Sequence, residues 1–264
     1  MGWMRRLLLL GSVWSVLAAA QTPVVADGGV VNAASFAREP VAPGSLVSIF
    51  GSELASALAQ ADSIPLSTSL GGVSVLFNDI AAPLLFVSGG QINAQLPWSV
   101  ISAESGEATV VVTRGGVVSA QRAFQVRRTS PGIFALSGGM AVAVNADDGT
   151  LAQPEGAVPG IRSEPARIGR AVILYANGLG PVNPPIASGE AAGSTLRTNT
   201  LTPTILVGGR EVQPLFSGLA PQFVGVNQIN FIVPEGVTPG SAVPLQIRVG
   251  EQTTPSTVTI AVRN

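Results

Sequence analysis

The sequence predicts an all-β protein that consists of two tandem β-sandwich domains. The chain of 264 residues contains 31 glycines and 20 prolines, and 46% of its residues are hydrophobic. Such a chain is not disordered, and its frequent Gly and Pro residues indicate short strands that are joined by turns. The tripeptide Gln-Ile-Asn at residues 91–93 returns at residues 228–230, each time shortly before a proline, Pro97 or Pro234. A repeat unit this large is typical of a duplicated domain rather than of a solenoid.

The first 20 residues have the layout of a secretory signal peptide. Arg5 and Arg6 precede an apolar run at residues 7–17, and three alanines at residues 18–20 offer a cleavage site. The apolar run is shorter than the roughly 20 residues that a membrane-spanning helix needs. We therefore expect a signal peptide at residues 1–20, with an uncleaved anchor as the alternative. The mature protein would be secreted, extracellular or periplasmic, with no membrane span.

Several kinds of function are disfavoured because the chain contains no cysteine, histidine or lysine. Catalytic triads, Cys-His pairs and Ser-Lys dyads cannot be built, and zinc sites of His and Cys are impossible. The net charge is −1 and no basic cluster occurs, so nucleic acid is not an expected partner. We expect a protein that is not an enzyme, with no catalytic residue, metal site or cofactor. A glycosidase that uses paired carboxylates is the remaining enzymatic alternative.

The first domain is expected at residues 21–129. A polar lead-in at 21–29 is followed by strands at 30–36 and 46–50. Residues 52–61 contain good helix formers, with Ser52 as a possible cap and Leu54 and Leu58 spaced for one face, so they predict one or two helical turns. Further strands are expected at 73–77, 80–87, 91–96, 108–114 and 117–126. Asn78-Asp79 and Gly115-Gly116 predict tight turns.

The second domain is expected at residues 130–264. It opens with a strand at 140–145 and a hairpin turn at Asp147-Asp148-Gly149. Residues 153–165 indicate an exposed loop, residues 171–176 a strand and residues 177–193 a loop rich in Pro and Gly. The repeated block then covers residues 202–234. Alternating apolar residues predict the last strands, at 243–249 and 256–262.

Seven or so short strands in each unit indicate an immunoglobulin-like sandwich. Several motifs of the first unit resemble the IPT/TIG family of immunoglobulin-like domains. The second unit has weaker matches to the same family, such as Gly169 and Val207-Gly208-Gly209. The motifs of the first unit are Pro43-Gly44-x-x-Val47-x-Ile49-x-Gly51, Val73-x-Val75-x-Phe77-Asn78, Ala82-Pro83, Ile92-x-Ala94-x-Leu96-Pro97, Gly106 and Val110-x-Val112. This resemblance covers nearly all of the mature chain and implies no catalytic residues.

Three further segments, at residues 31–35, 131–135 and 175–182, are similar to one uncharacterised domain family. In that family the domain pair stands at the C-terminal end of large secreted proteins of soil bacteria. Here it directly follows the expected signal peptide. Because immunoglobulin-like modules serve many functions, the resemblance implies a fold and an exported location, and no specific activity.

Two polar motifs have a structural and a functional interpretation. Residues 145–150 place oxygen-bearing side chains at positions suited to Ca²⁺, but Asp-Gly between apolar runs is first of all a hairpin turn. In the repeated Gln-Ile-Asn, the isoleucines are expected in the core and the amides are expected to satisfy backbone groups of loops. A ligand contact by these amides is the alternative.

The favoured function is a non-catalytic protein-interaction, adhesion or spacer module at the cell surface, and the alternative is a carbohydrate-binding module. The partner would be a protein or a glycan. Trp98 is the single tryptophan after residue 20 and could stack on a sugar. The longer loop at residues 217–227 is where the two copies differ most. The candidate contact residues are Trp98, Asn177, Pro184, Gln222 and Phe223.

Overall fold

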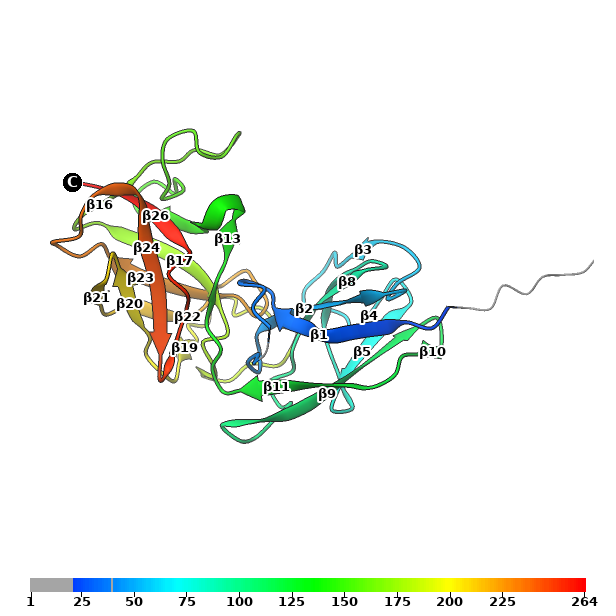
Figure 1. The fold of residues 1–264 in the computed structure, drawn as a ribbon. Coiled ribbons are helices and arrows are strands. Elements are labelled where there is room, and N and C mark those ends of the chain that lie inside the picture. Colours follow the sequence, from blue (N-terminus) through cyan, green and yellow to red (C-terminus); the bar gives the residue numbers. More distant parts are fainter. Residues whose placement is uncertain (1–20, 39) are drawn as a thin grey trace, which may run out of the picture.

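The computed structural model describes residues 21–38 and 40–264, so the expected signal peptide lies outside the described residues. The described residues form β-strands and one 3₁₀ turn, Ser137–Gly139. They fold as two tandem immunoglobulin-like sandwiches, each with its own hydrophobic core (Figure 1). The expected all-β fold class is confirmed.

The first sandwich consists of two facing sheets, A and B. Sheet A has the strand order β1 (Val24–Asn32), β2 (Leu46–Ser52), β8 (Gln91–Gln95), β7 (Leu84–Val87) and β3 (Ala59–Gln60). Sheet B has the order β10 (Val117–Val118), β9 (Ser105–Arg114), β5 (Val73–Phe77) and β4 (Ser69–Leu70), while β11 (Arg122–Arg127) pairs with β9 and β6 (Ile80–Ala81) with β5. Alternate residues of both sheets, such as Ile49 and Val110, are fully buried between them.

The second sandwich consists of sheets C and D. Sheet C has the order β12 (Gly132–Ile133), β17 (Ala171–Asn177), β23 (Asn227–Ile232), β22 (Phe216–Leu219), β19 (Thr198–Asn199) and β18 (Val182–Asn183), and β15 (Ala143–Asn145) pairs with β17. Sheet D has the order β13 (Ala135–Leu136), β14 (Met140–Ala141), β26 (Thr259–Arg263), β24 (Gly240–Val249), β20 (Thr204–Val207) and β21 (Arg210–Val212), while β16 (Ala166–Arg167) pairs with β26 and β25 (Gln252–Thr253) with β24.

The two sandwiches repeat the same strand pairing. The neighbours β2, β8 and β7 of sheet A correspond to β17, β23 and β22 of sheet C, and the pair β5–β9 corresponds to β20–β24. Ile92 lies opposite Ile49, and Ile229 lies opposite Leu174. Ile92 and Ile229 are both fully buried, which confirms their expected place in the core.

The expected tight turns are present in the first sandwich. Asn78 and Asp79 have φ angles of 45° and 64° and join Phe77 to its partner Ile80. Two consecutive positive φ angles suit the right-handed twist of a hairpin, and Asn and Asp tolerate them better than most residues do. The hairpin turns expected from the sequence are therefore confirmed here.

The predicted helix at residues 52–61 is wrong. Leu54 is fully buried whereas Leu58 is 71% exposed, so the two leucines do not share one face. Glu53 adopts a φ of 56°, a left-handed conformation that a right-handed helix cannot contain. The segment is an extended, bent connection that ends in β3, the short edge strand of sheet A.

Several strand boundaries also differ from those expected, for example at residues 21–29 and at residues 80–87. The segment at residues 21–29 is not a lead-in, because β1 already begins at Val24 and its Val25 enters the core. The expected strand at residues 80–87 is divided into β6 and β7, which belong to different sheets. The division falls at Ala82-Pro83, where proline cannot donate a backbone hydrogen bond and so interrupts the ladder.

Candidate functional site

The junction between the two sandwiches is organised around the fully buried side chain of Asn177, at the end of β17. Its Oδ1 accepts from the backbone N–H of Leu46 at 2.9 Å, and its Nδ2 donates to the Leu46 carbonyl at 2.8 Å. The Nδ2 group also donates to Oδ1 of Asn32 at 3.0 Å. The amide of Asn177 thus pairs with the first residue of β2 as another strand would, and it joins sheet C to sheet A.

A second contact between the sandwiches is made by the segment after β18. Gly189 donates its backbone N–H to Oε1 of the buried Gln95 at 2.6 Å, and its carbonyl accepts from the N–H of Leu66 at 2.9 Å. The backbone N–H of Trp98 donates to Oγ of Ser188 at 3.2 Å. The junction therefore has polar contacts at two separate places, which restrains rotation of one sandwich against the other.

The structure places the five candidate contact residues in different surroundings. Pro184, Gln222 and Phe223 are exposed, and Phe223 keeps 51% of its surface accessible. Asn177 is buried in the junction, so its side chain is not accessible to a ligand. Trp98 is half-buried and packs beside Val182 in a small apolar cluster. Of the five candidates, two lie at the junction between the sandwiches and three lie on the surface.

Trp98 lines a pocket at the junction with a volume of about 270 Å³. The other lining residues come from both sandwiches and are mostly apolar: Pro43, Ile101, Ser102, Ala103, Glu104, Arg128, Pro181, Val182, Pro185 and Ile186. Arg128 and Glu104 form an ion pair there with an Nη1–Oε1 distance of 2.6 Å. Nε1 of Trp98 is buried and makes no hydrogen bond with the described residues. The indole is therefore partly covered at the junction, and part of its surface lines the pocket.

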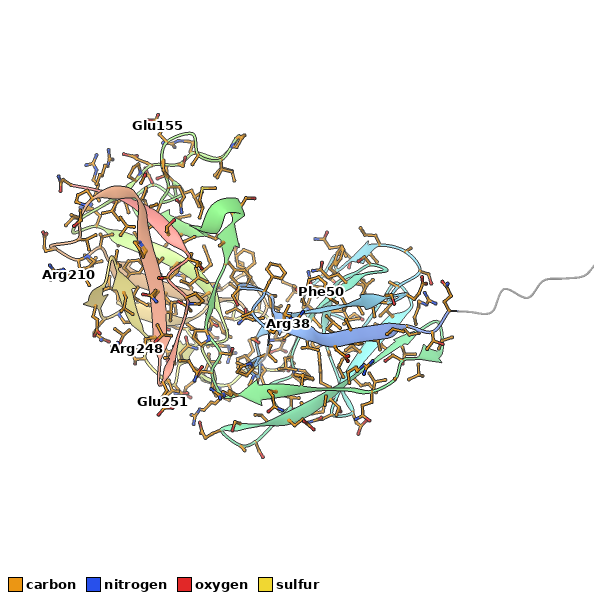
Figure 2. The ribbon with its side chains drawn as sticks, in the orientation of Figure 1. Arg38, Phe50, Glu155, Arg210, Arg248 and Glu251 are labelled. Carbon is orange, nitrogen blue, oxygen red and sulfur yellow. The ribbon has the colours of Figure 1, made fainter. Side chains whose placement is uncertain are left out.

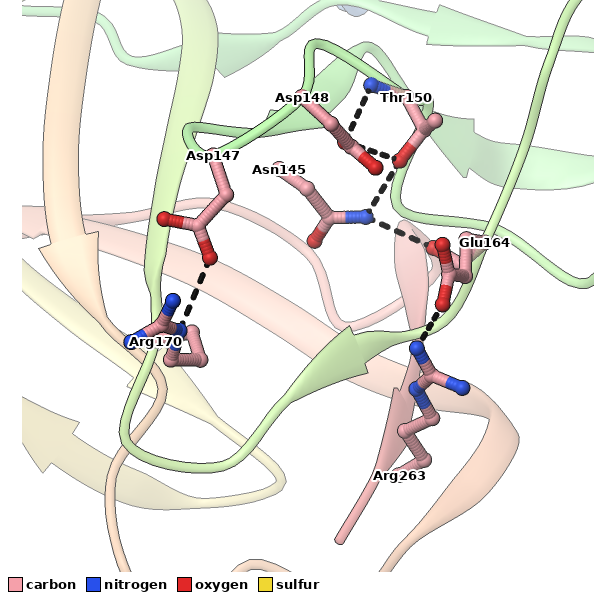
Figure 3. Close-up of polar contacts among 7 residues, drawn as sticks. All are labelled: Asn145, Asp147, Asp148, Thr150, Glu164, Arg170 and Arg263. Carbon is pink, nitrogen blue, oxygen red and sulfur yellow. Dashed lines mark hydrogen bonds and ion pairs between the residues drawn. The ribbon is translucent and has the colours of Figure 1, made fainter.

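The turn at residues 145–150 is a hairpin turn, as expected. Val144 and Leu151 form an antiparallel bridge, and the N–H of Asn145 donates to the carbonyl of Thr150 at 2.8 Å. Figure 3 shows that Asp148 accepts from both the backbone N–H and the hydroxyl of Thr150, at 2.9 and 2.7 Å. Nδ2 of Asn145 donates to the same hydroxyl and to the carbonyl of Glu164.

The acidic groups around this turn are engaged with separate partners. Asp147 pairs with Nε of Arg170 at 2.9 Å, and Glu164 pairs with Arg263 (Figure 3). Within residues 21–38 and 40–264, no three acidic side chains lie together in a group that could hold a metal ion. Two hydrogen bonds from Thr150 hold the pKa of Asp148 below its ordinary value. The geometry fits a hairpin turn whose acidic groups are each engaged with a partner of their own.

The lowered pKa of Asp148 predicts an acid-sensitive turn. Because the folded-state pKa lies below the unfolded one, the hydrogen bonds to the carboxylate stabilise the turn above about pH 4 and are lost as the pH falls through the folded pKa. The amide resonance of Thr150, followed by NMR, is expected to shift with a midpoint below the ordinary aspartate pKa. In Asp148→Asn the amide oxygen still accepts, so that shift should disappear while the hairpin remains. A Thr150 midpoint at or above the ordinary value would contradict this interpretation.

Sequence reasoning missed Asn32, Ser188 and Gly189 at the junction. Asn32 binds the carbonyl of Ser130 through its Nδ2, and it accepts from Asn177 through its Oδ1. Asn32 lies in the segment at residues 31–35, and Asn177 lies in the segment at residues 175–182. Both segments resemble the same family of domain pairs, which was the signal that could have identified Asn32. Ser188 and Gly189 lie within residues 177–193, where the composition indicated only a loop rich in Pro and Gly.

The chain was compared with family models, curated proteins and solved structures. No family model and no curated protein matches it. Among solved structures, it is similar to the full extracellular region of plexin A4, with 12% identity and a TM-score of 0.26 over 98% of this chain and 17% of that one. The surface glycan-binding protein PbSGBP-B from Prevotella bryantii has 13% identity and a TM-score of 0.26 over 89% of this chain and 41% of that one. Domains 5–6 of the S-layer protein SbsC have 12% identity and a TM-score of 0.27, with coverage of 92% and 99%.

This chain spans less than half the length of the first two of these structures. Similarities with such low identities and TM-scores do not show what this protein does. The description of its domains as immunoglobulin-like sandwiches is based on how the strands of this chain pair into sheets. In the described part of the chain, no helix has the length and apolar character needed to cross a membrane.

Proposed function

We propose that this protein is a non-catalytic module that works outside the cytoplasm and presents binding surfaces at a fixed angle, as an interaction, adhesion or spacer protein. The observation that carries this proposal is the buried amide of Asn177, which bonds both backbone groups of Leu46 across the junction. If a flexible linker joined the two sandwiches, the side-chain amide of Asn177 and the backbone groups of Leu46 would form hydrogen bonds with water instead of with each other. A pair of sandwiches coupled in this way suits a protein that holds its partners at a set distance.

We assign residues 21–129 and 130–264 to two domains of the IPT/TIG type. The first core draws on residues between Val25 and Val126, and the second on residues between Ile133 and Val262, which supports a boundary close to residue 130. The segments at residues 31–35 and 175–182, which carry the resemblance to the soil-bacterial domain pair, contain Asn32 and Asn177. The resemblance therefore includes the residues that couple the two domains.

The proposal predicts that the two sandwiches tumble as one body. Residual dipolar couplings from the two sandwiches are expected to fit a single alignment tensor, and small-angle scattering should match the angle of the structure. Separate tensors for the two sandwiches would contradict the fixed angle.

Export and partner binding are tested separately. After fractionation of the producing bacterium, the protein is expected in the periplasm, the outer membrane or the medium, in a form that begins near Gln21. Recovery in the cytoplasm with residues 1–20 intact would contradict export. Affinity capture from envelope and culture fractions is expected to recover a specific partner, and a consistent failure to do so would count against the interaction role.

A carbohydrate-binding module is the second candidate function. Trp98 gives this function less support than a fully exposed indole would, because it is half-buried and packs against residues of the other sandwich. The exposed Phe223, which packs against Tyr175 on the outer face of sheet C, supplies a different reason.

A further inference from the structure

Two outer surfaces of the protein repeat one arrangement of three aromatic and two amide side chains. We call them aromatic–amide patch 1 and aromatic–amide patch 2. Patch 1 consists of Phe36, Phe50, Phe86, Gln91 and Asn93 in the first sandwich. Patch 2 consists of Phe223, Tyr175, Phe216, Gln228 and Asn230 in the second. The Gln and Asn residues are those of the repeated Gln-Ile-Asn.

The strand register places the members of patch 1 side by side. Phe50 of β2 lies opposite Gln91, and Phe86 of β7 lies opposite Asn93. Directly opposite residues share a face of the sheet. Because Ile92 between the two amides points into the core, Gln91 and Asn93 point outward. The four side chains therefore form one outward group on sheet A.

Patch 2 has the same register on sheet C. Tyr175 of β17 lies opposite Gln228, and Phe216 of β22 lies opposite Asn230. Ile229 points into the second core, so the amides of this copy also face outward. The duplication has therefore kept two aromatic–amide pairs on the outer face of a sheet in each sandwich.

Each patch gains its third aromatic ring from a loop. The ring of Phe36 lies 6.3 Å from that of Phe50, and the ring of Phe223 lies 6.2 Å from that of Tyr175. Phe36 is 58% exposed and Phe223 is 51% exposed. The cores are filled by Phe77, Phe124 and Phe231, whereas every other phenylalanine except Phe134 belongs to a patch. Large exposed rings at matching places in two copies are typical of a contact surface.

The amides of each patch are held in one orientation by each other. Nε2 of Gln91 donates to Oδ1 of Asn93 at 2.8 Å, and Nε2 of Gln228 donates to Oδ1 of Asn230 at 3.0 Å. The expectation that these amides satisfy loop backbone groups is therefore wrong. Oε1 of each Gln and Nδ2 of each Asn make no hydrogen bond within the described residues. Each patch thus offers one acceptor and one donor between aromatic rings.

We infer that the two aromatic–amide patches are binding subsites for a neutral polysaccharide. A sugar hydroxyl both donates and accepts, so it can bridge the free Gln oxygen and Asn nitrogen of a patch. The apolar C–H face of the same sugar can lie on the flanking rings. None of the ten side chains is charged, which favours an uncharged polymer over an acidic one. This inference names a ligand for the binding role of the proposed function and rests on that role; it is independent of the spacer role.

The two patches flank the junction, so one polymer chain can reach both. Leu46, at the junction end of β2, has an outward side chain that packs against Gly225 of the other sandwich. Phe223 comes from the same loop as Gly225, and Tyr175 lies two residues before Asn177 on β17. Figure 2 shows Phe50 in the half of the first sandwich that is nearer to the second. The sheet faces that carry the patches therefore meet at the junction.

Affinity electrophoresis of the full chain tests this inference, with gels that contain mixed-linkage β-glucan, laminarin, galactomannan, soluble starch or the acidic polymer polygalacturonate. At least one of the neutral polymers is expected to retard the protein, and polygalacturonate is not. Phe36→Ala and Phe223→Ala should each weaken binding on the order of tenfold, since each removes one stacking face. Short oligosaccharides should bind more than about tenfold more weakly than the polymer, because they cannot occupy both patches.

Matched variants separate binding from folding. Val118→Ala and Ile161→Ala remove similarly exposed apolar side chains, 55% and 49% accessible, at sites away from the patches and should leave retardation unchanged. Asn93→Asp and Asn230→Asp keep the acceptor for the Gln nitrogen and replace the free donor by a charged acceptor, so they should weaken binding with little change in Tm. The inference is overturned if none of the four neutral polymers retards the protein. It is also overturned if the patch variants are retarded as strongly as the native protein, or if only polygalacturonate retards it. The alignment-tensor measurement still tests the spacer role in each of these cases.

Discussion

Asn177→Ala is expected to lower the free energy of unfolding by about 2 to 4 kcal/mol and the Tm by roughly 10 °C. The substitution leaves the N–H of Leu46 without a partner, in a place where the native side chain of Asn177 is fully buried. It also removes one of the two hydrogen bonds to the Leu46 carbonyl, which still accepts from the N–H of Ala33 at 3.1 Å. Each buried backbone group that loses its hydrogen bond costs about 1 to 3 kcal/mol, and the emptied volume adds a smaller cost. Urea and thermal unfolding, followed by circular dichroism, measure this loss.

The same substitution is expected to free the two sandwiches from each other. With Asn177 absent, the polar contacts left at the junction include those of Gln95 and Leu66 with Gly189, and that of Trp98 with Ser188. We expect residual dipolar couplings of Asn177→Ala to need two alignment tensors where the native protein needs one. This outcome would distinguish a weakened junction from a general loss of stability.

Two further variants show whether the amide itself is responsible. Asn177→Asp has nearly the same shape but turns an oxygen toward the Leu46 carbonyl and Oδ1 of Asn32, so it should destabilise at least as much as Asn177→Ala. Asn230→Ala changes the same residue type on the neighbouring strand, where the side chain is partly exposed, and should cost less than about 1 kcal/mol. Equal small effects of all three variants would show that the junction does not depend on Asn177.

The repeat was the most informative part of the sequence. Gln-Ile-Asn occurs in both halves because each copy forms the central strand of a sheet, with isoleucine in the core. Alternating apolar residues and Gly-Gly or Asn-Asp turns predicted most strands for local reasons, since period-2 burial and positive φ angles leave a direct trace in the sequence. Alternating burial and turn residues depend only on residues that are close together in the sequence.

The junction could not be predicted in the same way. Asn177 and Leu46 are separated by 131 positions, and the side chain of Asn177 replaces a backbone partner, which no local pattern encodes. Residues 52–61 show the opposite problem, because good helix formers stand there but burial of Leu54 in the core overrides their preference. The outward aromatic rings were also hidden, since Phe50 and Phe86 become neighbours of the amides only through the register.

Gly44→Ala is expected to lower the free energy of unfolding by about 3 to 4 kcal/mol. Gly44 has a φ of 76°, and a Cβ at this position would overlap the ring carbons Cζ3, Cη2 and Cε3 of Trp98. A shift of the indole would disturb its packing beside Val182 and Ile186 of the other sandwich. The cost therefore has two parts, backbone strain and displacement of a packed ring, and chemical denaturation measures their sum.

Gly72→Ala separates the two parts. Gly72 has the same φ of 76°, but nothing lies within 4 Å of a Cβ placed there, so this variant should cost only about 1 kcal/mol of backbone strain. In a Trp98→Leu background, where the overlapping ring carbons are absent, Gly44→Ala should cost about as much as Gly72→Ala. If the full cost of Gly44→Ala persists in that background, the ring is not what excludes a side chain at Gly44. If the cost falls as expected, Gly44 is glycine because the indole that lines the junction pocket occupies the space of its side chain.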